Sequence, residues 1–545
     1  MDPIGGEAAD EGDAVPDAQL NRLVTQVAKR AENMASELLR NTFVPVRSLM
    51  AHLEAPEHHV LFGRRGTGKT HLLRYLQDQK AAQGCLAIYL DLRKIGSPED
   101  IISAEPESFS ERATGLLVDV VEHIHNEVYD EVLTDRWTPL LSGISEGLDA
   151  LAGAATQIRV IGETEVERQE EVAAQAERSR GVAVAVGRDF HASWHRDSQN
   201  QQYKRKFERR LSRGRVRHHL LLGPLSSAIQ ALVRALEGRQ LWVLIDEWSA
   251  LPLDLQPLMA DLLRRTFFAT TGVVVKISAI HGRSRFSDIE TLGSPVGLEL
   301  GADTAASLDL DDFLLFRNDV ASTLEFYATL LHRHLTAIVV RSDRPALAAL
   351  RGINCPGDLT KRLFADHDSF HNLVLGAEGV PRDALQIAGL AAGAAHNQRI
   401  GSMHVATATR DFFLRDKEGS LPKPAHRVFA NLIEQCARQR SRIIPLRRDG
   451  ESNEEIIQRL YDARLIHRVR QGVSLDPEHP AEVYDVYVID YGCFLGLLKS
   501  GRIRAVEDGL DPGARFADAN EVEIRGRSFV RMPVGWYRHP LRPRN

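Results

Sequence analysis

The most restrictive stretch of the sequence is LFGRRGTGKT, Leu61–Thr70, which fits the pattern G-x-x-x-x-G-K-[ST]. The apolar run before it is typical of a buried strand, and THLLRYLQDQ after it places its leucines on one helical face. In the order strand, glycine loop and helix, backbone N–H groups and the helix dipole point at one anion site. The alternative is a plain glycine turn with a surface lysine, but the flanking strand and helix favour a phosphate-binding loop (P-loop). We therefore expect a nucleotide to bind here.

The side chains of this loop have separate expected roles. Lys69 can reach the β- and γ-phosphates, and the hydroxyl of Thr70 can hold Mg²⁺. The residues that we expect to contact the nucleotide are Gly63, Arg64, Arg65, Gly66, Thr67, Gly68, Lys69, Thr70 and His71.

A second motif ends in two carboxylates. Gln240–Trp248 reads QLWVLIDEW, which predicts a buried strand that delivers Asp246 and Glu247 to its end. We expect Asp246 in the Mg²⁺ shell, and Glu247 to orient and deprotonate an attacking water. Such a pair is often only a solvated loop start, but its position downstream of the P-loop favours the catalytic interpretation. Glu247 favours hydrolysis over binding alone.

Further buried strands are predicted for Cys85–Leu92 (CLAIYLDL) and for Gly272–Ile280, with Ser278 near the end of the latter. Ser278 could sense the γ-phosphate or hold the attacking water, and a small residue kept for packing is an equal alternative. An arginine from the same chain or from a neighbour could also reach the phosphates, and the sequence does not choose among Arg264, Arg265, Arg283 and Arg285.

Length and composition limit the class of protein. At 545 residues the chain is long enough for about three to four domains. It has no run of 18 apolar residues, and its N-terminus lacks the pattern of a signal peptide. The four cysteines are scattered, which argues for a reducing cytoplasm and against a disulfide framework or a zinc site. A net charge of −6 gives no overall attraction to nucleic acid, so any such binding must come from local basic patches.

Strands that alternate with helices across residues 58–300 predict an α/β fold, a parallel sheet with helices on both faces. A segment at 104–219 reads as an insertion. It starts with a helix at Glu107–Glu131, and Gln157–Val172 and Gly181–Gly187 then alternate like a β-hairpin. The basic segment 204–217, whose charges are interleaved with the aromatic residues Tyr203 and Phe207, could hold a nucleic-acid backbone, or it could be a solvated helix face or a linker.

The two ends of the chain differ from this core. A helix predicted for Asp17–Arg40 could lie against the base or simply pack, and packing is slightly favoured. After residue 304 helical periodicity replaces strands, and Pro381 opens a helix that could aim Arg382 at the γ-phosphate; the alternative is an exposed arginine. The predicted divisions are a disordered acidic N-terminus (1–17), a P-loop core (18–303), a helical lid (304–415), a winged helix (416–504) and a basic tail (505–545).

The winged-helix prediction rests on element order. Helices at Ala425–Arg438 and after Ser452 precede two strands, IHRV and VYDVYVIDY. Winged helices bind DNA or serve as protein-packing modules, and both alternatives stay open here. The basic residues that could face DNA are Arg438, Arg440, Arg442, Arg447, Arg448 and Arg459.

Taken in order, the segments GRRGTGKT, LIDEW, VVKISAI, GVPRDAL and RIGSMHVATA resemble the AAA+ ATPases of the origin-recognition (ORC-like) group and the related STAND NTPases. The resemblance implies that ATP binds at Gly63–Thr70, that Mg²⁺ is held at Thr70 and Asp246, and that Glu247 activates water. It also implies sensor roles for Ser278 and Arg382. It places the 104–219 insertion where initiator-type members carry DNA-contacting elements, although this insertion is longer than theirs. No arginine finger can be assigned.

Two functions follow as expectations. The first is an ATP-hydrolysing AAA+ switch coupled to DNA binding or to assembly of a nucleoprotein or defence complex. The second is a STAND-like regulatory NTPase whose output is nucleotide-gated binding of a partner protein without DNA. The expected partners are double-stranded DNA, through 204–217 and the winged helix, and a second copy or another protein. No membrane contact is expected, and the expected location is the cytoplasm.

Overall fold

The computed structural model describes residues 14–27, 34–96, 109–155, 158–161, 215–218, 221–288, 296–305, 307–314, 320–339, 349–439, 442–447, 454–474 and 483–499. Several predictions lie outside these residues: the disordered N-terminus up to residue 13, the strand at Gly181–Gly187, most of the basic segment 204–217, the N-cap at Ser452 and the basic tail.

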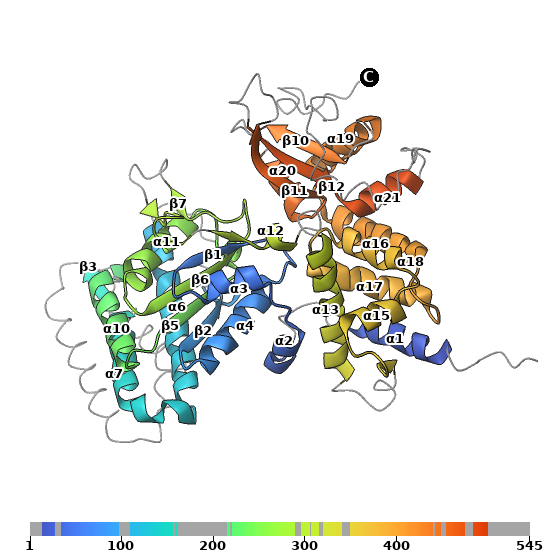
Figure 1. Cartoon of the computed structure of the whole chain (residues 1–545). Helices are drawn as coiled ribbons and strands as arrows, with labels where there is room; N and C mark the ends of the chain where they lie inside the picture. The colour runs from blue at the N-terminus through green and yellow to red at the C-terminus, as the bar shows by residue number, and fades with distance from the viewer. Residues whose placement is uncertain are drawn as a thin grey trace, which may run out of the picture.

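A five-stranded sheet forms the centre of the core (Figure 1). Its order is β2 (Leu86–Asp91), β5 (Leu241–Asp246), β6 (Val273–Ala279), β1 (His59–Phe62) and β9 (Leu308–Asp309). Every neighbouring pair is parallel, which confirms the predicted sheet. Four of the strands are those predicted from apolar runs; β9 was missed because two residues carry no periodic signal.

Helices cover both faces of the sheet, as predicted. As a consequence, every residue of strands β1, β2, β5 and β6 is buried. Side chains such as Val60 and Val243 pack under one layer of helices, and Leu61 and Leu244 pack under the other. The first layer contains α6 (Phe109–Val132), α7 (Leu141–Ala155), α10 (Leu222–Ala235) and α11 (Gln256–Leu263). The second contains α3 (Arg47–Glu54) and α4 (Lys69–Ala82).

The predicted insertion 104–219 needs correction. Its helix at Glu107–Glu131 is confirmed as α6, but α6 and the unpredicted α7 form one face of the core, so residues 109–155 are not an addition to it. Small residues let α7 approach α10 closely: a methyl group added to Gly147 would lie 2.8 Å from the Cα of Leu232. The helix also carries Ile144, Leu148 and Leu151 at helical spacing, so its signal was present in the sequence and was overlooked.

The predicted hairpin is described only in part. The first strand is present as β3 (Ile158–Ile161), which pairs antiparallel with β4 (Arg215–His218) at the end of the basic segment, and the predicted second strand at Gly181–Gly187 lies outside the described residues. Alternation of apolar and polar residues predicts that a segment forms a strand, but it does not identify the partner. A second small pair joins β7 (Ser287–Asp288) to β8 (Val296–Gly297).

The N-terminal helix predicted for Asp17–Arg40 is two helices, α1 (Ala14–Gln26) and α2 (Ser36–Thr42). The packing interpretation holds for α1: Asn21 donates hydrogen bonds of 2.8 Å to the carbonyls of His396 and Gln398, beside α17. In Figure 1, α1 lies next to α15 and α17, with the helical domain rather than the P-loop core.

The helical domain follows the sheet. It consists of α12 (Leu310–Leu314), α13 (Val320–Val339), α15 (Pro356–Leu363), α16 (His367–Ala377), α17 (Pro381–Ala395) and α18 (Ser402–Phe412). The predicted helix start at Pro381 is confirmed, with the proline in the first turn after Val380. Among the described residues, no helix of the chain is long and apolar enough to cross a membrane.

The C-terminal module contains α19 (Lys423–Gln439), β10 (Ile443–Arg447), α20 (Glu454–Asp462), β11 (Ile466–Ser474), β12 (Val483–Ile489) and α21 (Tyr491–Lys499). The two predicted helices and the hairpin β11–β12 are present, whereas β10, which pairs with β12, and α21 were missed. The prediction that Arg442 faces DNA is wrong. Arg442 is buried, pairs with Glu378 and donates to the carbonyl of Ile489.

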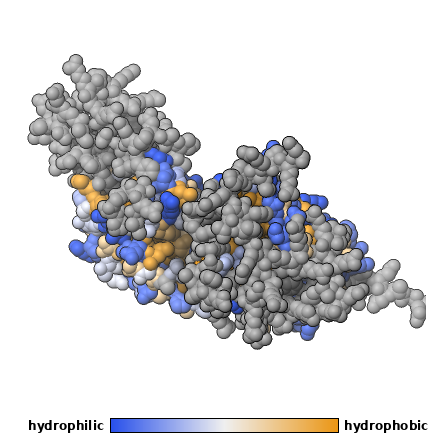
Figure 2. Space-filling model, turned by 90° about the horizontal axis from the view of Figure 1, so that it is seen from above, coloured by the Kyte–Doolittle hydropathy of each residue, from blue (hydrophilic) through white to orange (hydrophobic). Residues whose placement is uncertain are grey.

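Short segments complete the described chain. They are η2 (Leu92–Lys94), η4 (Asp135–Leu140), η6 (Trp248–Ala250), η7 (Arg264–Phe268), η8 (Phe413–Lys417) and η9 (Glu418–Ser420), of which η7 and η8 are π-helical turns. Seen from above, the described surface mixes hydrophilic and hydrophobic residues (Figure 2).

Candidate nucleotide-binding site

The parallel sheet brings the predicted motifs to one edge. The P-loop follows β1, and the register places Leu61 of β1 level with Ser278 of β6. Asp246 ends β5, level with Asp91 at the end of β2. Because parallel strands end on the same side, three motifs that together span more than 200 residues of the chain, from Gly63 to Ser278, meet there.

The loop has the backbone that a phosphate cradle requires. Gly66 and Gly68 have φ values of 92° and 101°, in the left-handed region that favours glycine. Gly68 is the residue before the first turn of α4, so the loop turns directly into the positive end of this helix. The chain therefore presents the anion-binding geometry that the sequence predicts.

Lys69 points into its own loop. Its Nζ donates to the carbonyl of Gly63 at 2.7 Å and to that of Arg64 at 3.1 Å. Burial lowers the pKa of Lys69, and the carboxylates of Asp246 and Glu247 partly offset this effect. The ammonium is thus held by carbonyl oxygens that phosphate oxygens could replace. The hydroxyl of Thr67 also donates to the carbonyl of Arg64, at 2.9 Å.

Asp246 is the centre of a group of hydroxyls. Its Oδ2 accepts from the hydroxyl of Thr70 at 2.6 Å and from that of Tyr89 at 2.6 Å, and its Oδ1 accepts from the hydroxyl of Ser278. The two predicted Mg²⁺ ligands, Thr70 and Asp246, therefore face one another directly. Ser278 contacts the acidic pair, which supports a polar role beyond packing.

Glu247 sits in a left-handed backbone conformation, with φ 58°. Its N–H donates to Oδ1 of Asp246 at 2.9 Å and to the hydroxyl of Ser278 at 3.2 Å, and these bonds hold the strained turn. Burial, followed by the charge of Asp246, raises the pKa of Glu247, while Lys69 and Arg93 lower it. A side chain that is 23% exposed, with a raised pKa, suits a proton acceptor.

Arg382 lies against the P-loop. Its backbone N–H donates to the carbonyl of Gly66 at 3.2 Å, and a methyl group added to Gly66 would lie 2.9 Å from Nε of Arg382. The proline-initiated helix α17 thus brings this arginine to the loop, as the sequence predicts. The finer claim that Arg382 contacts a γ-phosphate stays a prediction.

The remaining loop residues divide into two groups. Arg65 is exposed, whereas Arg64 is buried and turned toward the C-terminal module. His71 lies on α4 with Nε2 2.6 Å from the carbonyl of Leu39, and its ring meets Phe43 edge-on at 5.3 Å. His71 therefore faces the α2 segment.

None of the four arginine-finger candidates has a described partner in the loop. Arg264 and Arg265 both pair with Asp261 at 2.6 Å, and Arg283 pairs with Asp462 of α20. The main chain of Arg285 is bonded to Gln256 and Trp248. The four stay unassigned.

Two residues of the site were missed from the sequence. Tyr89 belongs to a strand that was predicted only as apolar filling, and Arg93 follows that strand. Arg93 makes a 2.8 Å ion pair with Asp91 and approaches Glu247 at 3.8 Å. The available signal for Arg93 was DLR, Asp91–Arg93, where the predicted strand CLAIYLDL ends. Polar residues at the carboxyl edge of a parallel sheet face the ligand site of that sheet.

The donor set fits a magnesium nucleotide. The lysine, two positive-φ glycines and a helix start suit phosphates, and a hydroxyl beside a carboxylate suits a hard cation. Among the described residues, no group of three or more His, Cys, Asp or Glu is arranged to hold a metal ion. Mg²⁺ at this site would therefore be shared between the chain, the phosphates and water.

Comparison with known proteins adds one family. Residues 27–83 match the family model described as ORC-CDC6-like, and no curated protein matches the chain. Among solved structures, that of the Aeropyrum pernix Orc1 protein in complex with DNA is 14% identical and covers 84% of this chain and 94% of that chain. Its TM-score of 0.29 is too low to carry an argument about fold or function. The resemblance to the origin-recognition group is confirmed for the matched segment. Residues 27–83, which contain the P-loop, are therefore similar to the ORC-CDC6-like family.

Proposed function

We propose that the chain is a Mg²⁺-dependent ATPase of the AAA+ class that works as a molecular switch. The observation that carries the proposal is the cluster of Thr70, Asp246, Glu247 and Ser278 at the mouth of the P-loop. Glu247 is held beside the two candidate metal ligands by backbone hydrogen bonds, where it can accept a proton from an attacking water, and a plain binding site does not require such a carboxylate.

Each residue of the chain has a separate task in this proposal. Lys69 and the loop N–H groups bind the phosphates, and Thr70 and Asp246 would hold Mg²⁺. When bound, Mg²⁺ would neutralise negative charge on the phosphates. Glu247 orients a water and accepts its proton, while Ser278 fixes the backbone of Glu247 and the carboxylate of Asp246. Arg382 adds a second cation from the start of α17.

Arg93 restrains the proposed base. At 3.8 Å it lowers the pKa of Glu247 against the raising effects of burial and Asp246. Arg93 also binds Asp91 through Nε and Nη2, so its position is set by the end of β2. We infer that Arg93 tunes the proton affinity of Glu247.

Two outputs of the switch are proposed. The first is binding of duplex DNA, supported by the basic composition of 204–217 and by the exposed Arg459 and Arg470 of the C-terminal module. The second is nucleotide-gated binding of a partner protein. It is supported by the burial of Arg442, because this arginine pairs with Glu378 inside the protein and is lost from any DNA-binding face. A second copy of the chain is one such partner.

The decisive experiment is ATP turnover by the wild type and Glu247→Gln, each with and without duplex DNA. General-base removal is expected to lower turnover about 10²–10⁴-fold with ATP binding retained. Unchanged turnover in Glu247→Gln would remove Glu247 from the mechanism.

The same experiment separates the two outputs. Stimulation by DNA that falls steeply with added salt would support the DNA output, because phosphate contacts release counterions. Turnover that is indifferent to DNA at every salt concentration would support the protein partner. Asp411→Asn, at a partly exposed carboxylate of α18 that pairs with Arg410, is the matched control for the charge change.

A further inference from the structure

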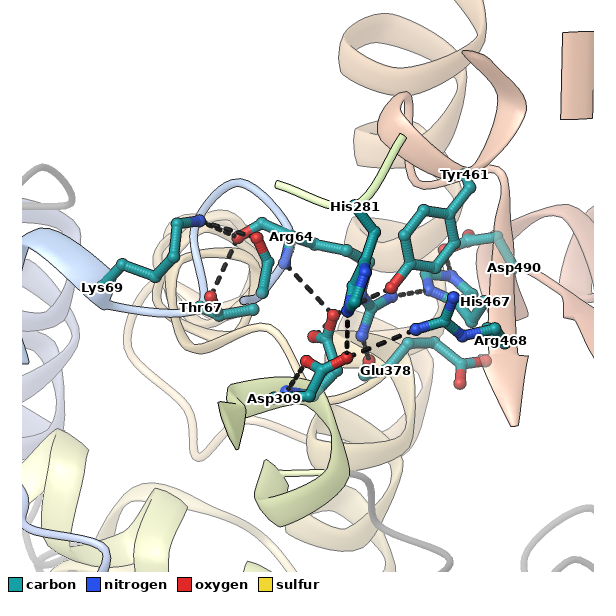
Figure 3. Close-up of polar contacts among 12 residues, drawn as sticks. Arg64, Thr67, Lys69, His281, Asp309, Glu378, Tyr461, His467, Arg468 and Asp490 are labelled. Carbon is teal, nitrogen blue, oxygen red and sulfur yellow. Dashed lines mark hydrogen bonds and ion pairs between the residues drawn. The ribbon is translucent and has the colours of Figure 1, made fainter. Parts of the chain in front are cut away.

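Arg64 is a buried cation in the P-loop that faces away from the phosphate side. Its side chain is 1% exposed, and Figure 3 shows it running from the loop on the side opposite Lys69. Its backbone N–H and Nε donate to the two oxygens of Asp311, at 3.1 and 3.0 Å. Its Nη2 donates to the carbonyl of Glu378 at 2.9 Å, and its Nη1 donates to Nδ1 of His467. A buried guanidinium is tolerated only with such complete pairing.

The bond to His467 fixes how this histidine carries its proton. Because Nδ1 accepts from Arg64, the proton of a neutral ring must sit on Nε2, which donates to Oδ2 of Asp490 at 2.9 Å. Burial lowers the pKa of His467, in agreement with a neutral ring. The P-loop is thus connected through Arg64 and His467 to Asp490, at the junction of β12 and α21.

A second connection from the same loop ends at the same carboxylate. Gly66 accepts from the backbone of Arg382, and the next residue, Asp383, lies 3.3 Å from Nζ of Lys417. Lys417 also binds Oδ2 of Asp490 at 2.6 Å. Burial alone would raise the pKa of Asp490, but Lys417 and His467 hold it well below its usual range. Two buried paths from the P-loop therefore meet in the C-terminal module.

The surroundings of Arg64 form one docking face, made by α20 and the start of β11. Tyr461 donates to Asp311 at 2.9 Å, Arg468 pairs with Asp309 at 3.3 Å, and Gln458 donates to the carbonyl of His281 at 2.6 Å. In the helix-then-hairpin order, α20 is the helix that a winged helix would offer to DNA. Here that helix is packed against the core.

We propose that Arg64 is a positioning residue, which ties the conformation of the P-loop to docking of the C-terminal module, so that nucleotide affinity and docking are coupled. This inference rests on the proposed function, because it assigns Arg64 to the regulation of the same site. Docking holds the loop and Arg382 in place, so releasing the module weakens nucleotide binding. By linkage, nucleotide binding strengthens docking by the same factor.

The test measures the dissociation constant of ATP·Mg²⁺ for the full chain by calorimetry. The variants are Arg64→Lys, which keeps the charge but loses the forked pairing, and His467→Ala, which touches no part of the loop backbone. Each is expected to weaken binding at least about fivefold. The double variant should bind ATP·Mg²⁺ no more weakly than the single variant with the lower affinity, because both substitutions break the same path.

Controls separate positioning from loss of stability. Ser474→Ala lies exposed on the same strand, β11, and should bind ATP like the wild type. In both test variants KM should rise while kcat at saturating ATP stays within about twofold, because Arg64 acts on binding rather than on the attacking water. If Arg64→Lys does not fold, His467→Ala alone decides.

The outcomes are distinct for the two proposals. Equal ATP affinity in the wild type, Arg64→Lys and His467→Ala would overturn the positioning role and leave the ATPase proposal standing. Weakened affinity with additive effects in the double variant would also overturn it, because the two residues would then act independently. No ATP binding by the wild type would overturn both.

Discussion

The two sides of the P-loop differ in the kind of contact that they make. On one side, Lys69 is bonded to carbonyls of its own loop, and Thr70 meets Asp246 across a site whose Glu247 side chain is 23% exposed. On the other side, Arg64 is sealed from solvent against Asp311 and His467. The first set of contacts can be exchanged for a ligand. The second set can be exchanged only if part of the protein moves.

This difference teaches how one short loop can have two functions. A ligand site needs polar groups whose hydrogen bonds within the protein can be exchanged for bonds to the ligand. A docking site needs charged groups that are fully paired within the fold. The P-loop contains residues of both kinds. Arg64 and Gly66 face the other domains, and Lys69 and Thr70 face the carboxylates at the end of β5. The predictions below test whether the two sides can be damaged separately.

The largest effect is expected on the phosphate side. Asp246→Asn should lower turnover at least about 100-fold, because it removes a metal-binding charge worth several kcal/mol in the transition state. Its effect on folding should be small, since the amide oxygen can still accept from Thr70 and Tyr89. Turnover at several Mg²⁺ concentrations measures it, with Asp254→Asn as the control on an exposed carboxylate. Full recovery of turnover by excess Mg²⁺ would assign Asp246 to metal affinity alone.

The largest effect on stability is expected on the docking side. Asp490→Asn should lower the free energy of unfolding by about 3 kcal/mol, because Lys417 would remain buried without its closest carboxylate. Denaturant unfolding measures it. Asp411→Asn, which breaks a partly exposed pair with Arg410, should cost less than about 1 kcal/mol. Equal losses in the two variants would contradict the account of the buried network.

A smaller effect concerns the pH dependence of turnover. Arg93 lowers the pKa of Glu247, so Arg93→Ala should raise that pKa further. A base with a higher pKa is protonated at higher pH, so the acid limb of the pH–rate profile should move upward. A downward move, or no move with normal turnover, would show that Glu247 is not the titrating base.

The smallest effect is expected for an arginine that belongs to neither side. Arg265 pairs with Asp261 on its own helix and has no described contact with the loop, so Arg265→Ala should change turnover by less than about twofold. Turnover measured over a range of protein concentrations checks this. A loss that grows with concentration would instead identify Arg265 as acting on a neighbouring copy.

The sequence predicted the phosphate side well because its signals are local. GRRGTGKT and LIDEW each carry their own strand and loop, and Pro381 marks its own helix start. The register of the parallel sheet then brings them together without further information. Arg93 and Tyr89 could have been found the same way, from polar residues at a strand end.

The docking side could not be predicted from the sequence because its partners are far apart along the chain. Arg64 and His467 are 403 residues apart, and no local pattern relates a loop arginine to a strand histidine. Arg442 was interpreted as DNA-facing for the same reason: its charge is visible in the sequence, but its burial against Glu378 depends on tertiary packing. The pairing of β3 with β4 was missed through a similar dependence on tertiary packing.

The most direct test of the central claim is hydrogen exchange of the full-length Glu247→Gln variant with and without ATP·Mg²⁺. The account predicts that nucleotide slows exchange in the loop peptide 63–70 and also in the docking segment 454–474, which nucleotide does not touch. Protection confined to the loop would contradict the connection between the two sides. Absence of protection in the loop would contradict the nucleotide site itself.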